Sequence, residues 1–293
     1  MKLRLGVRGM MWLTLVIMMW GIISCRTQEE KCLEEVLSLP LANKEELQKV
    51  LDYYKDDSLK YQAVCFLIRN MPFHAGYEGN ALKHYYQYFD IYAQGKLGPH
   101  EVIDSLKENS FSVSQLKRIE DIANIDSSLL VQNVDWAFKV WREQPWGKNV
   151  SFDNFCEFVL PYRLGDEPLG FWREDIYKRY NPILDSIRLL PQAQDPLVAA
   201  KVLMDSLVVE QSHFTGLFPA GPHLGPSVVS WRAGSCREFA DLVVYVMRAL
   251  GIPCGTIWRC VEIITCRISG ILHWIKMEKR ILRNFPILIG NGL

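Results

Sequence analysis

The 293-residue sequence contains no Cys-x-x-Cys pair and no histidine–cysteine spacing typical of a zinc site, so it predicts neither a metal centre nor a cofactor. It has no excess of charge, because 33 basic residues balance 33 acidic ones, and this gives no reason to expect nucleic acid as a partner. It also contains no internal repeat and no low-complexity tract. What remains is a composition typical of a globular protein, long enough for one large or two modest hydrophobic cores.

The N-terminus has the pattern of an export signal. Basic residues among the first eight positions precede an apolar run over residues 10–23, which is short for a membrane span. The run ends in Ile22-Ile23-Ser24-Cys25, which resembles the lipobox of bacterial lipoproteins, where the cysteine is lipidated. A plain transmembrane anchor and an ordinary signal peptide with an incidental Cys25 are the alternatives. We therefore predict an exported lipoprotein of the outer membrane or cell surface, with a signal peptide over residues 1–24, a lipid on Cys25 and a polar tether over residues 25–42.

Residues 43–225 are predicted to be mostly helical. Asn43 and Asp195 stand where helix caps belong, and Pro196 follows at the first helical position. Few segments before residue 226 alternate as half-buried strands do. Cys65 and Cys156 lie in apolar neighbourhoods and are expected to be buried thiols. The expected helices cover residues 43–54, 57–71, 127–143 and 195–209.

The candidate chemistry lies in the stretch WRAGSCREFADLVVYVMRALGIPCG, from residue 231 to residue 255. Ser235 and Glu238 fit the capping box S-x-x-E, which makes Cys236 the first helical residue. Gly251 and Pro253 are typical of the residues that follow a helix. Between them, apolar residues recur at helical spacing and form one wide stripe that should face a core: Phe239, Leu242, Val243, Val246, Met247 and Leu250.

This position favours a reactive cysteine. Unpaired backbone amides and the helix dipole stabilise a thiolate at a helix N-terminus, and Arg232 and Arg237 add positive charge nearby. We therefore predict that Cys236 is a nucleophile and that its backbone amide contributes to an oxyanion hole. Trp231 either walls an acyl pocket or simply packs, and Cys254 is expected to be core.

The stretch resembles the cysteine motif of the transglutaminase-like superfamily, which has a papain-like cysteine fold. In that family a G-x-C-x-[DE] segment opens a helix that ends in R-A-L-G-I-P, and Gly234, Cys236, Glu238 and residues 248–253 match it here. Residues 152–174 are also similar to transglutaminase-like lipoproteins of Bacteroidetes. The resemblance implies an α+β fold, with a mostly helical region over residues 43–225 followed by an incomplete papain-like core over residues 226–256.

The resemblance also implies a histidine base and an aspartate beyond the cysteine helix. The sequence after that helix contains one histidine, His273, and no aspartate follows Asp241. His273, in a His-Trp pair, is therefore the candidate base. His223, in the Gly- and Pro-rich loop over residues 216–226, is a second candidate, although a lone loop histidine is more commonly solvated.

Residues 257–293 are predicted to be out of frame. Shifted by one base, the codons of residues 260–271 permit the sequence RGDNNxPHFWN, and those of residues 273–278 permit LDK[ND]G. The first is the kind of segment that the family has here, and the second is a hairpin turn. A genuine but displaced His273-Trp274 motif is the alternative, and the nucleotide sequence across residues 255–270 decides between the two.

The predicted function is transglutaminase-like acyl transfer through a thioester on Cys236, by hydrolysis of an amide or peptide or by cross-linking, on peptide or protein substrates. This chain is expected to be defective, because a thiolate without a base lacks the proton transfers that acyl exchange needs. The alternative from another class is a non-catalytic surface lipoprotein that binds a peptide or glycan in the same cleft.

Overall fold

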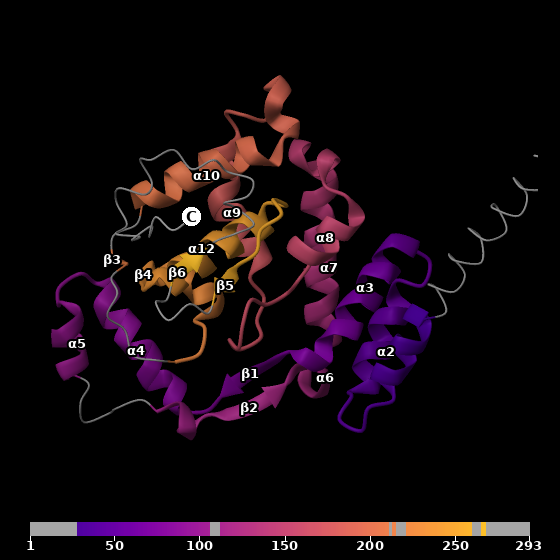
Figure 1. Cartoon of the computed structure of the whole chain (residues 1–293), viewed down its shortest axis with the longest axis horizontal. Helices are drawn as coiled ribbons and strands as arrows, with labels where there is room; N and C mark the ends of the chain where they lie inside the picture. The colour runs from indigo at the N-terminus through magenta and orange to yellow at the C-terminus, as the bar shows by residue number, and fades with distance from the viewer. Residues whose placement is uncertain (1–27, 106–111, 211–212, 215–220, 260–264, 268–293) are drawn as a thin grey trace, which may run out of the picture.

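The computed structural model describes residues 28–105, 112–210, 213–214, 221–259 and 265–267. Over these residues the chain has an α+β fold that is mostly helical, with three small two-stranded sheets. Helix α12 (Cys236–Ala249) lies in the middle of the larger group of helices, with α9 and α10 above it (Figure 1).

The elements follow one another in a simple order along the chain. A helix over residues 28–37 comes first. It is followed by α2 (Lys44–Tyr53), α3 (Ser58–Asn70), η1 (Met71–Phe73), β1 (Ala75–Glu78), α4 (Ala81–Ala93), α5 (Pro99–Ser105), η3 (Val113–Gln115), β2 (Lys117–Glu120), α6 (Asp121–Asn124), α7 (Ser127–Glu143), η4 (Pro145–Asn149) and α8 (Phe152–Phe158). The second half contains α9 (Arg173–Tyr180), η5 (Asn181–Leu184), η6 (Pro191–Gln194), α10 (Pro196–Glu210), β3 (His213–Phe214), η7 (Gly225–Ser227), α11 (Val228–Trp231), β4 (Ala233–Gly234), α12, β5 (Ile257–Arg259) and β6 (Thr265–Arg267).

The predicted helices are confirmed as α2, α3, α7 and α10. Local signals explain the starts of α7 and α10, because the Asp126 carboxylate accepts from the Ser128 amide at 2.6 Å and the Asp195 carboxylate accepts from the Leu197 amide at 2.9 Å. Asn43 precedes α2, but its side chain makes no capping bond there. Helices α2, α3, α7 and α8 pack on one hydrophobic cluster at one end of the molecule (Figure 1).

The segment that follows the predicted lipid anchor differs from our expectation. Residues 28–37 form a helix rather than part of a polar tether. Leu33, Val36 and Leu37 recur at helical spacing, and they pack on the cluster of α2, α3, α7 and α8, with Val36 buried. Cys25 lies outside the described residues, and the helices of the described part include none that is long and apolar enough to cross a membrane.

A second and larger cluster surrounds α12. It joins apolar residues of α4, α9, α10 and α11 to those of α12, so the cysteine helix shares a core with the helices that precede it. The apolar stripe predicted for α12 is confirmed as buried, and Cys254 is buried as predicted. The indole of Trp146 in η4 donates to the Leu250 carbonyl at 2.8 Å and so ties the end of α12 to the segment after α7.

The sheets are short, and sequence patterning missed them before residue 226. Strands β1 and β2 pair antiparallel, with Ala75 opposite Glu120 and Glu78 opposite Lys117. Helices α4 and α5 lie between these two strands in the sequence. The strand pair runs between α4 on one side and α6 on the other (Figure 1). The backbone of β3 pairs parallel with β4, immediately before the cysteine helix, and β5 pairs antiparallel with β6.

Candidate functional site

Cys236 occupies the position that its sequence predicts. It is the first residue of α12 and is exposed to solvent. The capping box is complete, because the Ser235 side chain accepts from the backbone amide of Glu238 and a Glu238 carboxylate oxygen accepts from the Ser235 amide at 2.7 Å. The Ser235 hydroxyl also accepts from the Arg237 amide at 3.2 Å. The thiol therefore stands at the positive end of a well-capped helix, where a thiolate and an oxyanion are both stabilised.

The backbone that leads into the cysteine is unusual. Gly234 has φ +144°, a conformation that L-residues rarely adopt. Arg232 has φ +49°, and it is the one non-glycine residue with positive φ in the described part of the chain. Such conformations persist only where the surrounding structure holds them, and they occur often at functional sites. Two of them within four residues of Cys236 support a functional role for this turn.

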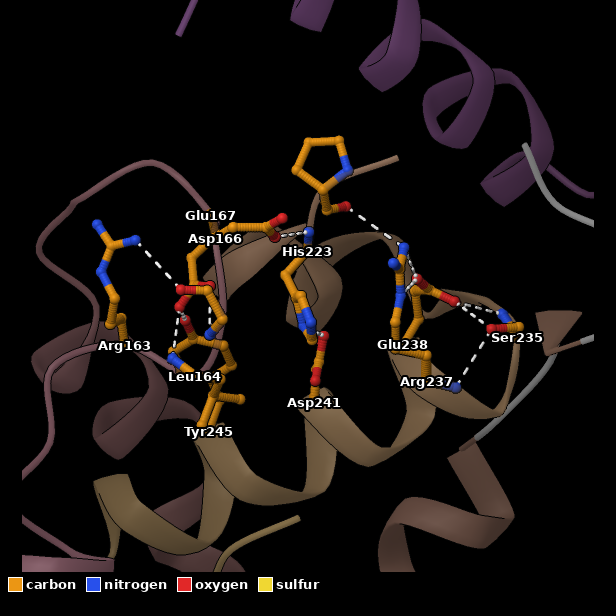
Figure 2. A network of polar contacts seen from close by, with 12 residues as sticks. Arg163, Leu164, Asp166, Glu167, His223, Ser235, Arg237, Glu238, Asp241 and Tyr245 are labelled. Carbon is orange, nitrogen blue, oxygen red and sulfur yellow. Dashed lines mark hydrogen bonds and ion pairs between the residues drawn. The ribbon is translucent and has the colours of Figure 1, made fainter. Parts of the chain in front are cut away.

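Arg237 fastens the loop before α11 to the first turn of α12. Its guanidinium donates to the Gly221 carbonyl at 2.8 Å and to the Pro222 carbonyl at 3.3 Å. It also bonds the buried Glu238 carboxylate at 2.7 Å (Figure 2). Burial works against the charged form of Glu238, but Arg237 and Ser235 together hold the pKa of Glu238 below its ordinary value. Residues 221 and 222 of the Gly- and Pro-rich loop are thus bonded to the first turn of α12.

His223 is paired, but not with the cysteine. Its Nδ1 lies 2.8 Å from an oxygen of the buried Asp241 carboxylate, and its backbone amide donates to Asp166 at 2.8 Å (Figure 2). Asp241 follows Cys236 by five residues, which on an α-helix is about 7.5 Å along the axis and about 140° around it. The imidazole is therefore held beside the second turn of α12. A carboxylate at Nδ1 leaves Nε2 available for a proton, as in a catalytic base, so the role of His223 as the base at Cys236 stays a prediction.

The His223–Asp241 pair predicts a pH dependence of stability. Burial opposes the imidazolium, but the hydrogen bond and charge of Asp241, with Glu167 adding to them and Arg237 opposing, raise the pKa of His223 above its ordinary value. A raised folded-state pKa stabilises the fold fully below the unfolded value of about 6.5, and this contribution is lost as pH rises through the folded pKa. Relative to a His223→Gln variant, the wild-type protein should therefore lose free energy of unfolding between about pH 6 and pH 8 in urea titrations. A difference that is constant or grows with pH would contradict this assignment.

Of the remaining site candidates, Trp231 lies within the described residues, and His273 and Cys25 do not. The ring of Trp231 lies 5.7 Å from that of Phe89 and 5.2 Å from that of Tyr86, and its indole bonds Asp90, so Trp231 packs against α4. This supports the packing alternative for Trp231. The described residues contain no cluster of three His, Cys, Asp or Glu side chains that could hold a metal ion.

Sequence reasoning missed the polar side of α12. Glu238, Asp241, Tyr245 and Arg248 recur at positions i, i+3, i+7 and i+10, and all four are buried. The Tyr245 hydroxyl donates to Glu167 at 2.6 Å, and the loop that carries Glu167 lies beside His223 (Figure 2). The spacing of these polar residues was the available signal, and it predicts a second contact face made of hydrogen bonds.

Comparisons with protein-family models, curated proteins and solved structures find no match to this chain. The cysteine motif, its capped helix and the turn before it therefore carry the functional argument by themselves.

Proposed function

We propose that Cys236 is the nucleophile of a transglutaminase-like, papain-like acyl-transfer site that acts on peptide or protein amides. The observation that carries the proposal is an exposed cysteine at the first position of a helix with a complete capping box. A buried structural thiol would not need this position. Cys254, for comparison, is fully buried, and burial raises the pKa of its thiol to about 12.

The chemistry follows from this position. The Cys236 thiolate attacks the amide carbonyl carbon, an S–C bond forms, and the carbonyl oxygen takes up negative charge that helix N-terminal amides stabilise. The C–N bond then breaks, the amine leaves with a proton, and a thioester remains for water or a second amine. The proton must come from a general acid, and Asp241, the partner of His223, lies about 7.5 Å along the axis of α12 and about 140° around it from Cys236.

We accordingly propose that this chain forms a reactive thiol but turns over amides slowly or not at all. A lipid anchor at Cys25 and an out-of-frame tail after about residue 256 complete the proposal. The rival function is a surface lipoprotein that binds a peptide or glycan without chemistry. It is favoured by the same geometry that limits turnover, the separation of Asp241, the partner of His223, from Cys236 along and around α12.

Alkylation with iodoacetamide tests the nucleophile. Near pH 7, Cys236 should be labelled about tenfold faster than the thiol of free cysteine, because alkylation needs the thiolate and not a base. Peptide mass spectrometry over a time course measures the rate at each cysteine, with Cys32, which is partly exposed on a helix, as the internal comparison. Cys236→Ser should abolish the fast phase, and Cys32→Ser should leave it unchanged. Labelling of Cys236 no faster than of free cysteine supports the binding function instead.

A further inference from the structure

A pocket lies between the β1–β2 pair and the loops over residues 164–166 and 221–224. It is open to solvent and has a volume of about 440 Å³, within the range of small-molecule sites, about 300–1,000 Å³. One wall is formed by residues 73–77 and residue 118, and the other by residues 164–166 and residue 223. The residues that line it are Phe73, His74, Ala75, Tyr77, Arg118, Leu164, Gly165, Asp166 and His223.

The pocket is held in shape by buried groups behind it. The Arg163 guanidinium, almost fully buried, donates to the Ala75 carbonyl at 2.8 Å and to the Gly165 carbonyl at 3.2 Å, so one side chain ties both walls together. The same guanidinium pairs with Asp121 at 2.7 Å. A side chain added at Gly165 would place its Cβ 2.3 Å from the imidazole of His223, so that ring packs directly on the loop. A cavity with walls fixed in this way is preformed.

The polar groups of the pocket have mixed character. Asp166 offers a carboxylate, and Arg118 offers a guanidinium that already bonds Glu120 at 2.5 Å. His223 has Nδ1 committed to Asp241, which leaves Nε2 as its second polar atom. An anionic ligand would meet the Asp166 carboxylate, and a cationic ligand would meet Arg118. A neutral ligand rich in hydroxyl groups, which both donate and accept, suits all of these groups at once.

Aromatic surface lies next to these polar groups. Phe73 lines the pocket and is 84% exposed, and Tyr77 on β1 is half-buried. Ring faces bind ligands that present C–H groups on one side. A pyranose ring combines a C–H face with hydroxyl groups around its edge.

We propose that this pocket is a saccharide-binding site, with Phe73 as the platform and Asp166 and Arg118 as hydrogen-bonding partners for hydroxyl groups. Cys236 is not among the residues that line this pocket, and the proposal does not depend on the proposed acyl transfer.

Titration of the whole chain with neutral sugars tests the site. The probes are glucose, galactose, mannose, N-acetylglucosamine and their trisaccharides, followed by calorimetry and by saturation-transfer NMR. At least one trisaccharide should bind with a millimolar or lower Kd. Phe73→Ala and Asp166→Asn should each weaken it at least about fivefold, the effect of about 1 kcal/mol of lost stacking or hydrogen bonding.

Matched variants separate this proposal from the alternatives. Phe171→Ala, at another exposed phenylalanine, and Cys236→Ser should bind as the wild type does. Unchanged binding in Phe73→Ala, with thermal unfolding confirming that the variant is folded, overturns the proposal. So does the absence of binding across the whole panel, or binding of glycylglycine or inorganic phosphate in its place.

Discussion

Replacement of Gly234 by alanine is expected to lower the free energy of unfolding by about 3 kcal/mol, from backbone strain and overlap of about 1–3 kcal/mol each. The residue has φ +144°, and an added Cβ would lie 2.3 Å from the Cβ of Glu238 and 2.5 Å from its Cγ. Glu238 cannot retreat without giving up its bonds to the Ser235 amide at 2.7 Å and the Ser235 hydroxyl at 2.6 Å. The substitution therefore breaks the capping box that positions Cys236.

Two measurements on the Gly234→Ala variant follow from this. Urea unfolding should show the loss of stability, and iodoacetamide labelling of Cys236 should slow toward the rate of free cysteine, since the thiol no longer stands at an ordered helix start. Gly170→Ala is the matched control, because nothing lies within 4 Å of its added Cβ, and its stability should stay within about 0.5 kcal/mol of the wild type. A Gly234→Ala protein as stable as that control would show that the turn is not constrained as described.

Local signals were enough to predict the cysteine helix. Its start depends on Ser235 and Glu238, three residues apart, and its end on Gly251, and each of these acts on the backbone next to it. The same holds for α7 and α10, whose caps at Asp126 and Asp195 are local. Where a few neighbouring residues determine an element, the sequence predicts it.

The parts that were missed depend on distant partners. Strands β1 and β2 have four residues each and pair Gly76 with Ile119, so neither contains an alternating run long enough to recognise alone. The helix over residues 28–37 has too few apolar residues to predict by itself, and it is stabilised by the cluster on which it packs. The His223–Asp241 pair joins a loop to a helix 18 residues away, a distance that no spacing rule covers.

In the candidate site, too, one part was predictable from local signals and another part was not. The position of Cys236 was predictable because a helix cap is a local device, whereas a general base reaches a thiol only through tertiary structure. The structure pairs His223 with Asp241, a contact that no local signal predicts, and the base at Cys236 stays a prediction.

Arg173→Met should be among the most destabilising single changes, with a loss of about 3–5 kcal/mol of unfolding free energy. The Arg173 guanidinium is buried, and it makes five hydrogen bonds, all to neutral oxygen atoms. One bond joins Asn133 of α7 at 2.6 Å and another joins the Arg248 carbonyl in the last turn of α12 at 3.1 Å. The other three acceptors are the carbonyls of Val159, Leu160 and Pro161, directly after α8.

This cation therefore lies at the C-terminal ends of two helices, where the helix dipole favours positive charge. Methionine would fill part of the volume but remove the guanidinium donors from the Val159 and Pro161 carbonyls and from the Asn133 side-chain oxygen. The Leu160 carbonyl would keep its bond from the Asn133 amide group, and the Arg248 carbonyl would keep its bond from the Gly251 amide. Arg173→Lys keeps the charge with three donors in place of five and should give an intermediate loss. Urea unfolding measures both, with Arg142→Met, at a half-exposed arginine whose ion pair spans 3.9 Å, as the control expected within about 0.5 kcal/mol of the wild type. If Arg173→Met lost no more stability than Arg142→Met, the guanidinium would not be what joins α12 to the N-terminal helices.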